Sequence, residues 1–90
     1  RNWQVAAVVT ECDEKGNAVL SLRNKLRAGE PVEVVGPDCR PFAMTVPELT
    51  DGDGLPQSEI RTPQSVFSMK LPQPVPPLSL VRRCADLSAV

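Results

Sequence analysis

The sequence predicts an all-β domain built as a small antiparallel, partly open β-barrel. Apolar and polar residues alternate with a period of two in at least five short segments, which is typical of half-buried strands. Turn signals rich in glycine, proline and aspartate separate these segments. No apolar stripe with the 3.6-residue period of a helix reaches a useful length. A nearly closed sheet also protects strand edges that a flat sheet exposes.

The first predicted element is a β-hairpin. Residues 3–12 are rich in β-branched side chains and apolar on both faces in the middle, which predicts a central strand. The alternation places Trp3, Val5, Ala7 and Val9 on one face. Residues 13–17 (DEKGN) are a turn signal, with Gly16 available for a positive φ. Residues 17–23 form the returning strand, with Ala18, Leu20 and Leu22 pointing to one side.

A second hairpin follows a loop over residues 24–31. Its strands are predicted at residues 32–35 (VEVV) and 41–46 (PFAMTV), with Phe42, Met44 and Val46 sharing a face. The sequence Gly-Pro-Asp at residues 36–38 supplies the turn between them.

The chain beyond Pro47 is expected to be mainly loop, with room for one short helical turn at residues 47–49. Residues 64–71 alternate again and predict a strand with Phe67, Met69 and Leu71 on one side. The four prolines of residues 71–77 predict an extended edge or surface segment. We expect residues 78–81 to dock on the core and the chain to fray from Arg82. The predicted domain spans residues 1–83, followed by a tail over residues 84–90.

Composition argues against a catalytic site and a metal site within this chain. It has 90 residues, a net charge of −1, no histidine and no tyrosine. A Ser–His–Asp or Cys–His arrangement therefore cannot form within it. The three cysteines, at positions 12, 39 and 84, have no paired spacing, so we predict free thiols and a cytoplasmic protein. We expect no catalytic residues, no metal ligands and no cofactor.

The chain reads as a soluble fragment whose upstream part is missing. It opens on Arg1 without a signal peptide, and its longest purely apolar run covers only residues 5–9, far short of the ~20 residues of a membrane helix. No membrane partner is expected.

The sequence DGDG at residues 51–54 resembles the start of a calcium-binding loop but departs from the calcium-loop pattern further on. Such a loop needs an oxygen ligand at its fifth position and glycine at its sixth. Those positions hold Leu55 and Pro56, so we interpret DGDG as a solvated turn. Nothing in the sequence desolvates Asp51 or Asp53, and neither is expected to have a shifted pKa.

A basic cluster is the candidate binding patch. Arg23, Lys25 and Arg27 lie on alternate positions after the second strand, and Arg82 and Arg83 add two charges near the end of the chain. Such a patch suits phosphate, but aromatic side chains that could stack on bases are scarce. The simpler interpretation is a solvated loop whose cations pair locally with Glu30 or Glu33.

The order of the segments resembles the C-terminal domain of the collagenase-like peptidase family U32. The resemblance spans about residues 3–83, through the stretches VAAVVTECDEKGNAVLSLRNKL, AGEPVEVVGPD, PFAMTV, DGDG and RTPQSVFSMKL…PVPPLSLVRR. The run GEPVEVVG also resembles the second-domain barrel of translation factors, which agrees with the predicted fold. Residues 61–64 read Arg-Thr-Pro-Gln where many relatives have a His-Pro pair, so no role of that histidine carries over.

The resemblance implies that the family's chemistry and its cysteine-containing signature lie in an N-terminal catalytic domain, and no stretch here matches that signature. Two hypotheses follow. The first is a non-catalytic accessory domain that orients substrate or packs on the missing catalytic domain of the same polypeptide. The alternative is an RNA-contacting module of an RNA-base hydroxylation enzyme, using Arg23, Lys25, Arg27, Arg82 and Arg83. The substrate of the parent enzyme would be a protein under the first hypothesis and an RNA under the alternative.

Overall fold

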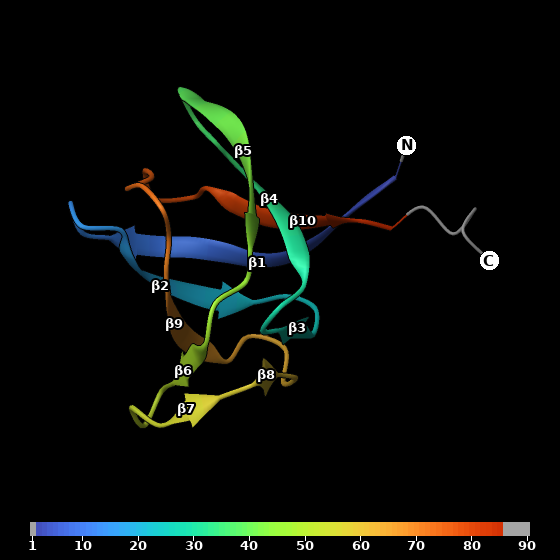
Figure 1. The fold of residues 1–90 in the computed structure, drawn as a ribbon, viewed down its shortest axis with the longest axis vertical. Coiled ribbons are helices and arrows are strands. Elements are labelled where there is room, and N and C mark those ends of the chain that lie inside the picture. The colour runs from blue at the N-terminus through green and yellow to red at the C-terminus, as the bar shows by residue number, and fades with distance from the viewer. Residues whose placement is uncertain (1, 86–90) are drawn as a thin grey trace.

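The computed structural model describes residues 2–85 and consists of ten β-strands, with no helix among those residues (Figure 1). Consequently, this part of the chain holds no helix able to cross a membrane. The strands are β1 (Trp3–Cys12), β2 (Asn17–Leu22), β3 (Leu26–Arg27), β4 (Pro31–Gly36), β5 (Cys39–Thr45), β6 (Leu49–Asp51), β7 (Pro56–Gln57), β8 (Glu59–Ile60), β9 (Val66–Lys70) and β10 (Leu80–Cys84).

Eight strands form one antiparallel sheet in the order β5-β4-β10-β1-β2-β9-β6-β7, and β3 pairs with β8 in a second, two-stranded sheet. The large sheet curls but does not close, since its end strands β5 and β7 are not paired with each other. The predicted all-β, partly open barrel is confirmed.

Both predicted hairpins form. β1 pairs with β2, and β4 pairs with β5. Gly16 adopts the expected positive φ, at 90°. The side chains predicted to share the inner face of β2 and of β9 are buried, and they meet in one core whose members include Ala18, Leu20, Leu22, Phe67, Met69 and Leu71.

The predicted common face of Trp3, Val5, Ala7 and Val9 is wrong. The register of β1 against β10 shifts between Val5 and Ala7, so Ala6 is an extra residue that reverses the alternation. Ala7 and Val9 are buried in the core, whereas Trp3 is exposed. This bulge turns Trp3 and Val5 to the outside of the barrel.

The region after Pro47 carries more sheet than expected. Residues 49–51 belong to β6, so the possible helical turn at residues 47–49 is wrong. The loop expected at residues 24–31 contains β3, which pairs with β8 through Leu26 and Ile60. The proline-rich segment over residues 71–77 forms no strand, and its Leu71 and Val75 are buried in the core rather than on the surface. The predicted docking of residues 78–81 on the core is confirmed by the buried Ser79 and Val81.

The expected fraying from Arg82 is also wrong. β10 lies between β4 and β1 and runs through Arg82 and Arg83 to Cys84. Cys84 is paired with Trp3, and β1 therefore begins where β10 ends, on one side of the molecule (Figure 1). The predicted tail over residues 84–90 lies, from residue 86 onward, outside the described residues.

Candidate functional site

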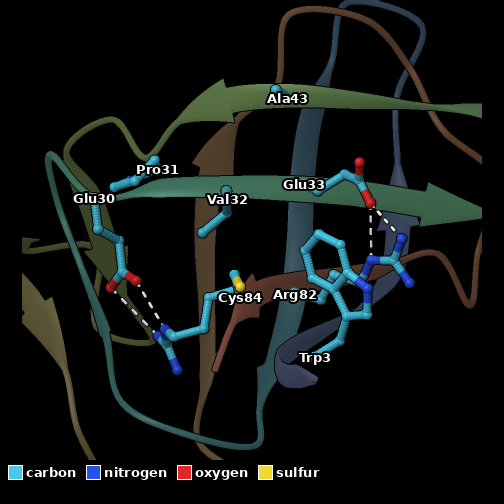
Figure 2. A pocket seen from close by; sticks show the side chains of 9 residues that line it. Trp3, Glu30, Pro31, Val32, Glu33, Ala43, Arg82 and Cys84 are labelled. Atoms are coloured by element: carbon cyan, nitrogen blue, oxygen red, sulfur yellow. Dashed lines mark hydrogen bonds and ion pairs between the residues drawn. The ribbon is translucent and has the colours of Figure 1, made fainter. Parts of the chain in front are cut away.

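A groove with a volume of about 430 Å³ lies over β1, β4, β5 and β10 (Figure 2). The strand register explains why residues far apart in the sequence meet there. Arg82 is directly opposite Val5 on one side and Glu33 on the other, and Glu33 is opposite Ala43. Residues that are opposite each other in antiparallel strands point to the same face. The groove is lined by Trp3, Glu30, Pro31, Val32, Glu33, Ala43, Arg82, Arg83 and Cys84.

Trp3, Arg82 and Glu33 form the first cluster of the groove. The guanidinium of Arg82 lies over the Trp3 ring, with its carbon 3.9 Å from the ring centroid, which is a cation–π contact. Arg82 Nε also donates to Glu33 Oε1 over 2.8 Å, and Arg82 Nη2 donates to the same oxygen. The carboxylate neutralises the arginine, so this cluster presents an aromatic ring beside an ion pair that has no net charge.

Arg83 and Glu30 also line the groove and form a second ion pair. Arg83 Nε donates to Glu30 Oε1 over 2.9 Å, and the same guanidinium donates to Gln4 Oε1 and to the carbonyl of Lys25. Glu30 also accepts the backbone N–H of Arg27 over 2.9 Å. Arg83 thus links β10 to β1 and to the loop before β4. Its positive charge is paired with Glu30 inside the domain.

The structure does not assemble the five predicted cations into one patch. Lys25, Arg27 and Arg83 line a second hollow of about 500 Å³ together with Gln4, Asn24 and Glu30. Arg23 lies apart from it and donates to Ser21 Oγ over 2.8 Å. Arg82 belongs to the groove with Trp3.

The expected local ion pairs are wrong in their partners. Glu33 pairs with Arg82 and Glu30 with Arg83, across sequence separations of 49 and 53 residues. The side chain of Arg27 pairs with Glu59 over 3.5 Å instead. The cause is the insertion of β10 beside β4, which places Arg82 opposite Glu33 and brings Arg83 within hydrogen-bond distance of Glu30.

The DGDG turn is held by Asp51. Its Oδ1 accepts the backbone N–H groups of Asp53 and Leu55 at 2.9 and 3.0 Å, and its Oδ2 accepts Gln57 Nε2 at 2.8 Å. The side-chain bond from Gln57, together with the two backbone bonds, lowers the pKa of Asp51 below its usual 3.8. The expectation of an unshifted pKa is wrong for Asp51, because hydrogen bonds stabilise a carboxylate even without burial.

Asp13 closes the β1–β2 turn in the same way. It accepts the backbone N–H groups of Lys15 and Asn17 and the side-chain amide of Asn17, and the Asn17 side chain is the largest cause of its lowered pKa. Both carboxylates therefore hold turns. Among residues 2–85, no group of three or more cysteine, aspartate or glutamate side chains is placed to bind a metal.

Acid should weaken the fold partly through these two turns. A carboxylate whose folded-state pKa is lowered stabilises the fold above its unfolded-state pKa, and this stabilisation is lost as the pH falls through the folded-state value. We expect the urea midpoint to fall as the pH drops from about 5 to about 3, because both folded-state pKa values lie below 3.8. The double variant Asp13→Asn/Asp51→Asn should have a lower midpoint at neutral pH and a smaller acid-induced drop. An equal drop in both proteins would assign acid sensitivity to other groups.

The three cysteines are free thiols: Cys12 and Cys39 are half-buried and Cys84 is exposed. Trp3 and Cys84 are among the groove residues that sequence reasoning missed. No local signal marks Trp3 as a groove residue, because the bulge at Ala6 that turns its side chain outward has no glycine to announce it.

Comparison with known proteins identifies close structural likenesses. The family model "Peptidase family U32 C-terminal domain" matches residues 1–82. The crystal structure of the C-terminal domain of a candidate U32 peptidase from Geobacillus thermoleovorans, in its selenomethionine variant, is 30% identical with a TM-score of 0.83, covering 89% of this chain and 99% of that chain. A second crystal structure of that domain is 28% identical with a TM-score of 0.82, covering 87% and 89%. A search of curated proteins finds no significant match. None of these findings supports the RNA-contacting alternative.

Proposed function

The chain belongs to the family of U32 peptidase C-terminal domains, and we propose that it is a non-catalytic accessory domain of a U32-type peptidase. The observation that carries the proposal is the family match over residues 1–82, joined to the fold shared with the C-terminal domains from Geobacillus thermoleovorans. Its role is to hold the peptidase domain and its substrate in a productive arrangement.

The chemistry of the groove favours binding over bond cleavage. Catalysis by a general acid or base needs a titratable group that is free to exchange a proton with the substrate. The groove carboxylates of Glu30 and Glu33 each accept hydrogen bonds from an arginine. Histidine is absent from the sequence, which removes the most common general base.

The three free thiols support a reducing, cytoplasmic location for the parent peptidase. Thiols in an oxidising compartment are normally paired in a domain of this size.

Purified alone, the chain should not cleave gelatin or a fluorogenic peptide library, because its groove offers paired ions and an aromatic surface but no activated nucleophile. The full-length peptidase, assayed under the same conditions, is the positive control. Turnover by the isolated chain that persists after repurification and after replacement of all three cysteines by alanine would place a catalytic site in this domain.

A further inference from the structure

The outer face of four neighbouring strands is unusually apolar. Antiparallel sheets with one face on the core normally turn polar side chains to solvent. Here the register aligns Val8, Leu80 and Val35 in one cross-strand row on the outside. The next row holds Val5, Arg82, Glu33 and Ala43, and Trp3 lies opposite Cys84 in the last. We refer to these residues of β1, β10, β4 and β5 as the outer face.

The outside of β2 and β9 is more polar. On β2 and β9 the corresponding cross-strand pairs are Asn17 with Lys70, Val19 with Ser68 and Ser21 with Val66. Each pair contains at least one polar side chain, as expected for a solvated face. The outer face thus carries two apolar rows on either side of the hydrogen-bonded pair Arg82–Glu33. Apolar area gathered on one side of a protein is typical of an interaction surface.

The charges of the outer face cancel within it. Arg82 and Glu33 are its only charged members and are hydrogen-bonded to each other. A nucleic acid gains affinity from cations that can neutralise phosphates, and Arg82 is already neutralised. The outer face therefore fits a largely apolar protein surface without net charge better than it fits a nucleic acid.

The outer face includes the first residue of β1, and this location favours one partner. β1 begins at Trp3, whose side chain lies on the outer face, so polypeptide that leads into β1 reaches the sheet beside this face. The family places this domain at the C-terminal end of a peptidase. A covalently linked neighbour is present at high effective concentration, which favours docking over any separate partner.

We propose that the outer face docks onto the peptidase domain that precedes it in the same polypeptide, with Trp3 as the anchor. The inference rests on the accessory function proposed above and names the surface that carries it. Tryptophan and arginine are the side chains most enriched among residues that dominate interface energies. Arg82 lies on the Trp3 ring and is held by Glu33, so the ring is fixed in place before docking, which reduces the entropy cost of binding.

The test uses the native thiols as probes. Cys84 is exposed and lines the groove, whereas Cys12 lies at the opposite end of β1. Iodoacetamide alkylation of each thiol is followed by mass spectrometry in the 90-residue chain and in the full-length peptidase. We expect Cys84 to react at least about tenfold more slowly in the full-length protein, since a docked thiol reacts only when the domains open. Cys12 should react at similar rates in both proteins.

Two variants of the full-length protein sharpen this test. Trp3→Ala should restore the reactivity of Cys84, whereas Val66→Ala, an exposed apolar residue on β9, should leave Cys84 protected. Equal Cys84 rates in the chain and in the full-length protein would overturn the proposal. Protection of Cys84 that appears only when RNA is added would also overturn the proposal. Protection that rises with the concentration of the isolated chain would indicate a second copy as the partner and would overturn it too.

The same samples separate this inference from the accessory function. Protected Cys84 in an enzyme whose gelatin turnover does not depend on this domain would support the docking surface and refute the accessory role. Dependence of turnover on the domain with an unprotected Cys84 would support the accessory role and refute the docking surface.

Discussion

Gly16→Ala is expected to lower the free energy of unfolding by about 2–5 kcal/mol, the sum of a left-handed backbone strain and a steric clash. Gly16 has a φ of 90°. A Cβ at this position would lie 2.4 Å from the carbonyl oxygen of Leu71, which is backbone and cannot rotate away. The N–H of Leu71 donates to the carbonyl of Gly16 over 2.8 Å, so the substitution separates the β1–β2 turn from the end of β9.

Gly29→Ala is a matched control for this substitution. Gly29 has a φ of 93°, but a Cβ at this position would meet no atom within 4 Å. Its alanine variant therefore carries only the backbone strain, about 1–2 kcal/mol. Urea unfolding of the two variants and the parent protein measures the difference. Equal midpoints for Gly16→Ala and Gly29→Ala would show that the approach of Leu71 to Gly16 is not a tight constraint.

Arg83→Ala is expected to cost about 1.5–3 kcal/mol, because it removes charge-assisted hydrogen bonds and leaves the carboxylate of Glu30 without its arginine. The two side chains are only 20% and 21% exposed, so water replaces the lost partner incompletely. The loss should appear as a lower urea midpoint with an unchanged slope.

The control for Arg83 is Arg61, which pairs with Glu59 at 3.2 Å but is 71% exposed. Arg61→Ala should change stability by no more than about 0.5 kcal/mol. If Arg83→Ala cost no more than Arg61→Ala, Arg83 would be a free surface cation, as the basic-patch interpretation requires, rather than a structural residue.

The elements with a local signal are predictable from the sequence. The strands around Leu20 and Phe67 and both hairpins carry a period of two over several residues, bounded by turns such as the one at Gly16, and these form as predicted. Strands β3, β7 and β8 have two residues each. Such strands are too short to show any period, because their formation depends on the partner that the fold brings beside them.

The site is less predictable because its contacts are distant in the chain. Sequence patterns mark Arg82 and Arg83 as candidate binding residues, but they suggest only sequence neighbours as partners. Placing β10 between β1 and β4 depends on pairings such as Arg82 with Glu33, which no local pattern encodes. Trp3 falls on the wrong face in a simple alternation because one extra residue at the Ala6 bulge reverses every position before it.

The contribution of this domain to a U32-type peptidase is measured most directly by kcat/KM for gelatin with the domain present, deleted, or carrying Trp3→Ala. We expect deletion and Trp3→Ala to lower kcat/KM by about ten- to a hundredfold, because a loosely held domain no longer positions the reacting groups, and we expect Val66→Ala to leave it unchanged. An unaltered kcat/KM after deletion of the domain would contradict the accessory function.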